Sequence, residues 1–394
     1  MKPAALPIAA RLRLPVLQPE AAASAAAAGA DPLAPLTPLA DGLHRPISYL
    51  RISLTDRCNY RCTYCMPEGG VDILPRAEIL SFEEIESIVA ALTQVGVRRV
   101  RLTGGEPTVR KDLLQLVQRL SQLGLTDLSL STNGERLAEL AVPLKEAGLT
   151  RLNVSLDSLS PARFREVTRR GNLDAVLAGL AAARRAGFRN TKLNTVAMRG
   201  FNDDELGALC RYAFTNDFIP RFIELMPMAQ GTLFYPGTFL PAAEIRATLR
   251  RELGELVELD AADGAPPGVG PARYTGVRFA DKVHRVGIIS AVTEPFCDTC
   301  NRIRLSATGQ LHACLAYDDA IDLRSILRGP LPITPLDDRE GAIEPAGADA
   351  SAAAQRTARL CAAARAGLQQ KRLGHEFTPS GCGGPKKHMV SIGG

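Results

Sequence analysis

The chain has no tryptophan, and aromatic residues make up only 5% of its 394 residues. It therefore has little material for the stacking platforms of many nucleic-acid-binding proteins. It has no run of 18 or more apolar residues, and its N-terminus lacks the apolar segment and cleavage site of a secretory signal. With a formal net charge of only +5, neither nucleic acid nor a membrane is an expected partner. We expect a soluble, cytoplasmic protein, with room for a local basic pocket that binds a small anion.

Nine cysteines in a chain without an export signal favour metal binding or catalysis over a disulfide framework. Six of them form two sets with the spacings C-x3-C-x2-C and C-x2-C-x13-C. A four-iron cluster normally has four thiolate ligands, so a set of three would leave one iron open to a substrate or cofactor. Zinc also needs four ligands, and His312 could complete only the second set. Spacing alone does not decide between the two metals. The sets are Cys58, Cys62 and Cys65, and Cys297, Cys300 and Cys314.

Residues 1–44 are rich in alanine and proline and lack apolar periodicity, which predicts a disordered leader; a transit peptide is the alternative. From Arg51 onwards, short β-rich runs alternate with helical patterns, as in a parallel β/α fold. Six candidate strands are too few for a closed eight-stranded barrel, so an open six-unit barrel and an open doubly wound sheet remain. These candidate strands are residues 47–54, 98–103, 127–131, 151–155, 192–198 and 220–225.

A loop rich in glycine, proline and alanine at residues 260–271 precedes three short runs with strand character. They predict a smaller, mainly antiparallel C-terminal domain. A second linker is expected at 329–350, followed by a helix over 351–373. We place the domain boundaries at 1–44, 45–255 and 256–394, with C-terminal strands at 273–280, 282–290 and 303–311.

Several positions that could contact a ligand fall at or near the ends of successive candidate strands. One is the run Thr103-Gly104-Gly105-Glu106-Pro107, in which a glycine pair allows a ligand to approach the backbone. In a parallel barrel these ends form one functional rim. Arg302 and Arg304, two residues apart, would share one face of a strand and could grip phosphate oxygens. The other rim and strand positions are Ser131, Ser155, Lys192 and Met226, with Arg51, Arg99, Arg101 and Arg221 inside or at the start of strands.

Together these motifs resemble the radical S-adenosylmethionine superfamily and, within it, the GTP 3′,8-cyclase family, over about residues 44–325 and the terminal Gly-Gly. The resemblance implies an open (β/α)6 partial TIM barrel with a C-terminal domain that carries a second iron–sulfur cluster. It implies a lyase that converts GTP to 3′,8-cyclo-7,8-dihydro-GTP, the first step of molybdenum cofactor biosynthesis. A 5′-deoxyadenosyl radical from S-adenosylmethionine would remove the 3′ hydrogen of the ribose.

The resemblance also assigns roles to particular residues. Each cysteine set would hold a 4Fe-4S cluster, the first binding S-adenosylmethionine and the second meeting the guanine of GTP. Arg302, Arg304, Gly393 and Gly394 would act in catalysis. Tyr64, Gly105, Ser155 and Met226 would contact S-adenosylmethionine. The substrate-binding positions would be Arg51, Arg99, Arg101, Ser131, Lys192, Arg221, Arg302, Ile303 and Arg304.

The expected partners are GTP, an electron donor such as flavodoxin or ferredoxin, a downstream pterin-forming synthase and a second copy in a homodimer. Two other functions fit parts of the pattern. A peptide-modifying maturase with two clusters usually has a different auxiliary cysteine spacing and does not need Arg302 and Arg304. A zinc-stabilised nucleic-acid-binding protein would lack the brown colour of iron–sulfur sites. Thr108 replaces the family's usual aliphatic residue, with no consequence that the sequence predicts.

Overall fold

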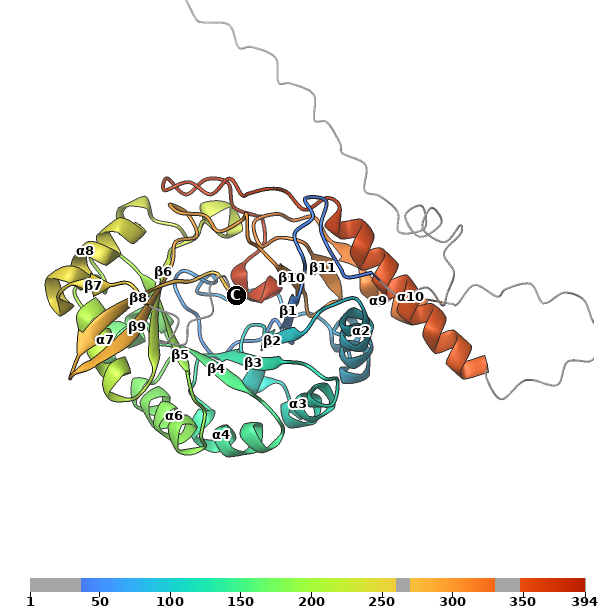
Figure 1. The fold of residues 1–394 in the computed structure, drawn as a ribbon, viewed down its shortest axis with the longest axis horizontal. Coiled ribbons are helices and arrows are strands. Elements are labelled where there is room, and N and C mark those ends of the chain that lie inside the picture. Colours follow the sequence, from blue (N-terminus) through green and yellow to red (C-terminus); the bar gives the residue numbers. More distant parts are fainter. Residues whose placement is uncertain (1–36, 260–269, 330–347, 394) are drawn as a thin grey trace, which may run out of the picture.

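The computed structural model of the protein describes residues 37–259, 270–329 and 348–393. Its first half is a run of six parallel strands, each hydrogen-bonded to the next. The strands curve around a centre and the helices cover the outside (Figure 1). This arrangement confirms the expected open (β/α)6 partial barrel. The strands are β1 (Tyr49–Ser53), β2 (Arg99–Thr103), β3 (Asp127–Thr132), β4 (Arg151–Ser155), β5 (Lys192–Ala197) and β6 (Ile219–Glu224).

The outer helices bury apolar faces against the sheet. In α2 (Phe82–Gln94), the Ser81 hydroxyl accepts from the Glu84 amide and the Glu84 carboxylate accepts from the Ser81 amide, as the capping box predicts. Ile85 and Ile88 of this helix are fully buried. The other helices of this part are α3 (Leu113–Ser121), α4 (Leu137–Glu146), α5 (Pro161–Thr168), α6 (Leu173–Arg185), α7 (Leu206–Thr215) and α8 (Ala242–Leu253).

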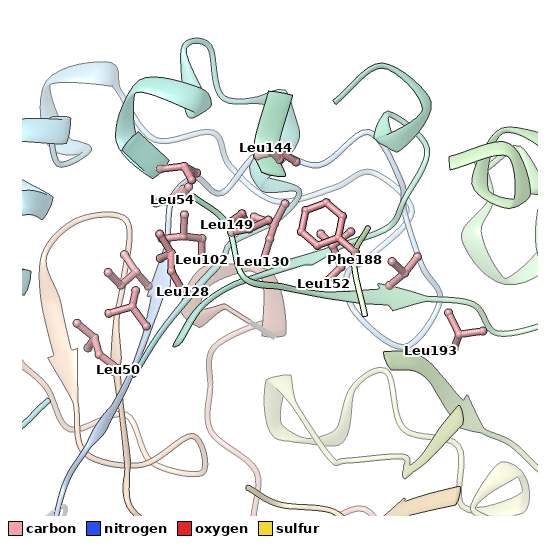
Figure 2. Close-up of a cluster of buried hydrophobic side chains, with 14 of the residues drawn as sticks. Leu50, Leu54, Leu102, Leu128, Leu130, Leu144, Leu149, Leu152, Phe188 and Leu193 are labelled. Atoms are coloured by element: carbon pink, nitrogen blue, oxygen red, sulfur yellow. The ribbon is translucent and has the colours of Figure 1, made fainter. Parts of the chain in front are cut away.

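Leucines dominate the core between the strands and these helices (Figure 2). Along β1, Leu50 and Ile52 are fully buried in this core. Because side chains alternate across a strand, Tyr49, Arg51 and Ser53 must face the other side, the barrel interior. The apolar pattern that fixes the register of each strand therefore also turns its polar residues inward.

The C-terminal strands extend both edges of the barrel sheet. β9 (Lys282–Ile289) pairs in parallel with β6, and β10 (Arg302–Leu305) pairs in parallel with β1. Residues 290–301 thus connect the two edges and carry Cys297 and Cys300. The strands beyond residue 255 continue the same sheet, so the sheet itself does not mark a domain boundary there. The predicted boundary between residues 255 and 256 stays a prediction. The remaining strands are β7 (Leu256–Val257), β8 (Arg273–Phe279), β11 (Gln310–His312) and β12 (Ile321–Asp322), each antiparallel to a neighbour.

One expected strand is in fact a hairpin. The run 303–311 divides into β10 and β11, since Gly309 adopts a positive φ of 84° in a turn that begins at Ser306. After α9 (Leu323–Arg328), the predicted helix of the C-terminal region forms as α10 (Ala348–Leu368), which packs against α2. The expected linker 329–350 lies mostly outside the described residues. Among the helices that the structure describes, none has both the length and the apolarity to cross a bilayer.

The end of the predicted leader packs onto the barrel, so its boundary at residue 44 is wrong. Leu39 is 1% exposed, and its amide donates to the Val95 carbonyl at 2.6 Å. Asp41 accepts from the Arg45 amide and pairs with its guanidinium at 2.6 Å. The sequence did not indicate that this segment is packed, because it is rich in proline and alanine and a single buried leucine produces no periodic pattern. Residues 1–36 lie outside the described part of the chain.

Replacing Leu39 by alanine is therefore expected to lower the free energy of unfolding by about 2–5 kcal/mol, the usual cost of deleting a buried leucine side chain. Leu43 of the same segment is 45% exposed and provides a matched control. Leu43→Ala should change stability by no more than about 0.5 kcal/mol. Urea unfolding of both variants measures the difference. Equal stabilities would show that this segment does not contribute to the barrel.

Candidate active site

Five arginines expected from the sequence lie on three neighbouring strands and share the inward face. The register pairs Arg99 with Tyr49 and Arg101 with Arg51 across β2 and β1. On the other side of β1, Arg302 pairs with Tyr49 and Arg304 with Arg51. Ile303 differs from the other expected substrate positions, since its side chain is 1% exposed in the apolar core beside Leu50. The alternation that turns Arg302 and Arg304 inward turns Ile303 outward, so only its main chain can face a ligand.

Further round the barrel, β5 and β6 add two more cations. The Arg221 guanidinium is buried and donates to the side-chain oxygens of Asn194 at 2.6 Å and Asn153 at 2.9 Å. Lys192 begins β5, where burial and the repulsion of Arg221 and Arg151 lower its amine pKa to about 6. Ser131 on β3 pairs in register with Asn153, and Ser155 on β4 pairs with Asn194. These asparagines had no sequence motif that could have identified them.

The interior has an excess of positive charge. Burial, followed by repulsion from Arg304 and Arg101, lowers the pKa of Arg51 well below its ordinary value. Burial and Arg302 lower the pKa of Arg304 to about 10. Cations that repel one another in a buried space are stabilised by an anion, so this interior is suited to a polyanionic ligand.

Asp127 on β3 offsets part of this charge. Its carboxylate accepts from Arg151 Nε at 2.7 Å and from Thr150 Oγ1 at 3.1 Å, and it pairs with Arg99 at 3.4 Å. Burial alone would raise its pKa, but the Arg151 contact lowers it. Asp127 and Arg151 were missed from the sequence, because a charged pair across two strands is visible only once the register is known.

The first cysteine set lies in the loop after β1, and the Gly-Gly-Glu-Pro run holds this loop. The Gly105 amide donates to the Thr55 carbonyl at 2.7 Å, and the Glu106 amide donates to the Arg57 carbonyl at 2.8 Å. A Cβ atom on Gly105 would lie 2.2 Å from the Arg57 oxygen. Gly105 is therefore required by the close passage of the cysteine loop, whatever its contact with a cofactor.

Glu106 is buried, and its hydrogen bonds explain why a threonine stands at position 108. Its carboxylate accepts from the Thr108 hydroxyl at 2.6 Å, the Thr132 hydroxyl at 2.7 Å and the Asn133 amide at 2.7 Å. Although burial raises the pKa of Glu106, these donors favour the carboxylate. Thr108 thus adds a hydrogen bond to a buried acid where an aliphatic residue could not.

The three thiols of the first set suit a metal cluster. They form no disulfide, and Cys62 and Cys65 each feel the charge of another thiol of the set. Burial raises the pKa of Cys58 to about 11 and of Cys65 to about 12, so a bound cation is needed to hold them as thiolates. In the described ranges no three His, Cys, Asp or Glu residues converge closely enough to hold one metal ion. A cubane places its thiolates on three different irons, so it fits wider spacing than a single zinc ion.

The expected cofactor positions gather beside this loop. The Tyr64 hydroxyl donates to Asp157 at 2.7 Å, just beyond Ser155 at the end of β4. Burial raises the pKa of Asp157 to about 6, and the hydrogen bond from Tyr64 opposes this rise. Tyr64, Met226 after β6 and Cys314 of the second set pack around one small apolar cluster. The first cysteine set follows the carboxyl end of β1, whereas Cys297 and Cys300 precede the amino end of the parallel strand β10, so the two sets lie at opposite ends of these strands.

In the second set, Cys300 is surrounded by cations. Arg302 Nη2 and Lys371 Nζ each lie 3.5 Å from its sulfur, and Lys371 also donates to the Arg302 carbonyl at 2.8 Å. Although burial opposes ionisation, Arg302 and Lys371 lower the thiol pKa to about 7. Lys371 was missed from the sequence, since it follows α10 and lies far along the chain from any motif.

The alternative zinc ligand, His312, is engaged elsewhere. Its Nδ1 lies 3.0 Å from the Asp319 carbonyl, and its Nε2 lies 3.2 Å from Lys387 Nζ. Burial and the Lys387 charge lower its pKa to about 4. Three free thiols with adjacent cations fit an iron–sulfur cluster better than a Cys3His zinc site.

Arg45 links the loop of the second cysteine set to the segment after α10. Its Nη1 donates to the Cys297 carbonyl at 2.6 Å, and its Nη2 donates to the Arg372 carbonyl at 2.8 Å. The segment after α10 is thereby fixed against the cysteine loop.

The C-terminal end of the chain enters the barrel (Figure 1). After α11 (Met389–Ile392), Arg304 Nη1 donates to the Ile392 carbonyl at 3.3 Å and to the Gly393 carbonyl. Gly393 has a φ of 71°, and a Cβ atom there would lie 2.5 Å from Thr103 Cγ2. Gly394 lies outside the described residues.

Comparison with known families agrees with this geometry. Residues 52–213 match the radical SAM superfamily, and residues 219–339 match the family described as Molybdenum Cofactor Synthesis C. The barrel and its cysteine loop therefore define a radical S-adenosylmethionine protein with a C-terminal region of the molybdenum cofactor type.

Named relatives narrow the class. A GTP 3′,8-cyclase of Pelotomaculum thermopropionicum is 48% identical over 289 residues, 73% of this chain and 87% of that protein. GTP 3′,8-cyclase 1 of Pseudomonas aeruginosa is 45% identical over 304 residues, 76% of this chain and 90% of that protein. One from Rhizobium etli is 44% identical over 294 residues, 74% of this chain and 82% of that protein. The chain belongs to the GTP 3′,8-cyclase family.

Proposed function

We propose that this chain is a GTP 3′,8-cyclase, which converts GTP to 3′,8-cyclo-7,8-dihydro-GTP in the first step of molybdenum cofactor biosynthesis. The observation that carries this proposal is a cationic barrel interior that lies between two sets of three free thiols. The family relationship supports the same substrate.

Cys58, Cys62 and Cys65 would hold the first 4Fe-4S cluster, and Cys297, Cys300 and Cys314 the second. When bound, the first cluster and S-adenosylmethionine supply the radical chemistry that begins at the ribose. Tyr64, Ser155 and Met226 would orient S-adenosylmethionine beside the first cluster.

The chain's own task is to bind and position GTP. Arg51, Arg101, Lys192 and Arg304 would hold its charged groups by charge-assisted hydrogen bonds. The tail, fastened to Arg304, fills the space beside Ser53 and Thr103 and helps to exclude water from the reacting atoms.

The direct test is anaerobic incubation of the reconstituted protein with S-adenosylmethionine, a reductant and GTP. We expect equal amounts of 5′-deoxyadenosine and the cyclised nucleotide. ATP, which carries the same triphosphate, should give much less cyclised product. Cleavage of S-adenosylmethionine that ignores GTP but responds to a peptide would instead favour a maturase.

The proposal includes partners that the family resemblance supports. These are flavodoxin or ferredoxin as electron donor, a pterin-forming synthase that takes the product, and a homodimer. The reaction would take place in the cytoplasm.

The lowered pKa of Lys192 predicts that GTP binding is linked to the uptake of a proton. With a pKa of about 6, its amine is mostly neutral at pH 8, and a bound triphosphate would favour the charged form. We therefore expect GTP binding at pH 8 to take up to about one proton, and affinity to fall by at most about tenfold per pH unit above pH 6. Below pH 6 the amine is already charged and this uptake disappears.

Calorimetry in two buffers of different ionisation enthalpy measures the uptake. At pH 8 the nucleotide is itself fully ionised and does not contribute. Lys192→Met should bind without proton uptake. Uptake that is the same in this variant and in the unmodified protein would remove Lys192 from the phosphate site.

A further inference from the structure

The hydroxyl of Tyr49 is buried and has no hydrogen-bond partner. Tyr49 begins β1 and is 2% exposed. Two guanidinium groups lie over its ring, with the centroid 4.9 Å from Arg99 Cζ and 5.4 Å from Arg101 Cζ. An unpaired hydroxyl in such a place is costly, and buried polar groups are almost always hydrogen-bonded. Phenylalanine would supply the same ring without this cost, so the hydroxyl calls for a function.

The surroundings show what kind of partner is missing. The phenol lies within electrostatic reach of Arg51, Arg151, Arg221 and Arg304, which come from four different strands. Guanidinium groups only donate hydrogen bonds, so they offer no acceptor for the hydroxyl proton. The carboxylate of Asp127 accepts from Arg151, Thr150 and Arg99, but not from Tyr49. The missing partner is a hydrogen-bond acceptor that can enter a space surrounded by cations. An anionic oxygen meets both conditions.

The level of Tyr49 in the barrel separates it from the first cysteine set. Tyr49, Arg99, Arg151 and Lys192 are the first residues of β1, β2, β4 and β5. The cysteine loop with Tyr64 follows the opposite end of β1. Cations therefore gather at the level of Tyr49, which pairs with Arg302 just after Cys300, whereas the first cysteine set lies at the carboxyl ends of the strands.

We propose that the Tyr49 hydroxyl donates a hydrogen bond to a phosphate oxygen of the bound nucleotide, between the guanidinium groups of Arg99 and Arg101. This inference rests on the proposed function and adds a residue to its substrate site. Tyr49 places one neutral donor among the cations, which fixes the orientation of the phosphate without adding further repulsion.

The test is Tyr49→Phe in the reconstituted enzyme, titrated anaerobically with GTP, guanosine and inorganic triphosphate. Loss of a hydrogen bond to a charged group should weaken binding of GTP and triphosphate by about tenfold or more. Guanosine, which has no phosphate, should bind both proteins equally. Iron content and melting temperature should not fall, because the substitution removes only an unpaired hydroxyl.

Tyr60→Phe is a matched control, since Tyr60 is also a buried tyrosine but packs edge-on against Phe164 in the cysteine loop region. It should leave triphosphate affinity within about twofold. Equal triphosphate affinity in Tyr49→Phe and the unmodified protein would overturn the inference, as would a loss of equal size for guanosine. If the unmodified protein bound triphosphate but not GTP, the proposed function would fail, and the triphosphate titration would still decide the role of Tyr49.

Discussion

Replacing Cys58, Cys62 and Cys65 together by serine is expected to abolish formation of 5′-deoxyadenosine. The hydroxyl of serine is a poor ligand for iron, and burial already disfavours the charged form at all three positions. The variant should retain about four irons per chain where the unmodified protein retains about eight, because the second set is untouched. Iron analysis and chromatography of the nucleoside measure both effects.

Cys382→Ser is the control, since Cys382 is exposed and belongs to neither set. It should keep the full iron content and activity. The assignment of the first site would be wrong if the triple variant still cleaved S-adenosylmethionine, or if it lost all of its iron while remaining folded.

Deleting Gly393 and Gly394 is expected to slow cyclisation by on the order of a hundredfold, which is what poor positioning of reacting groups can cost. The reason is structural, because Arg304 binds the carbonyls of Ile392 and Gly393 and would lose a fixed orientation. Iron content should be retained, and GTP affinity should change much less than the rate. Single-turnover rates and GTP titrations of the same preparation separate the two effects.

A single substitution sharpens this test. Gly393→Ala would force a Cβ atom to within 2.5 Å of Thr103 Cγ2 in a left-handed conformation. Gly124 has a similar positive φ of 66° with open space around it, so Gly124→Ala controls for backbone strain alone. Only the first variant should lose cyclisation. Full activity in Gly393→Ala would show that the tail is dispensable.

The sequence predicted the barrel strands well, since each combines buried apolar residues with a turn. It also predicted that Arg302 and Arg304 share one face of a strand, which depends only on alternation along that strand. It could not predict how the sheet ends, because pairing of β9 with β6 and of β10 with β1 is decided by contacts between distant segments. The expected contact of Ile303 with the substrate stays a prediction, and the outward direction of its side chain leaves only its main chain to make it.

The residues that the sequence missed share a physical cause. Lys371 acts on Cys300 from 71 residues away, and Arg45 reaches Cys297 across 252 residues. Asp127 is important only through its contacts with Arg151 and Arg99 on the two neighbouring strands. None of these contacts leaves a local pattern, whereas the eight-residue span of the first cysteine set does.

Because residues 290–301 connect the two edges of the sheet, the two cysteine sets come together at different stages of folding. The first set is local and needs only one loop, so its ligands come together at a small cost in chain entropy. The second set is complete only after β9 and β10 have joined opposite edges and the segments around Arg45 and Lys371 have closed over it. Contacts of such long sequence separation form slowly. Iron loading of the second set therefore reports that the whole barrel has been assembled, whereas loading of the first set does not.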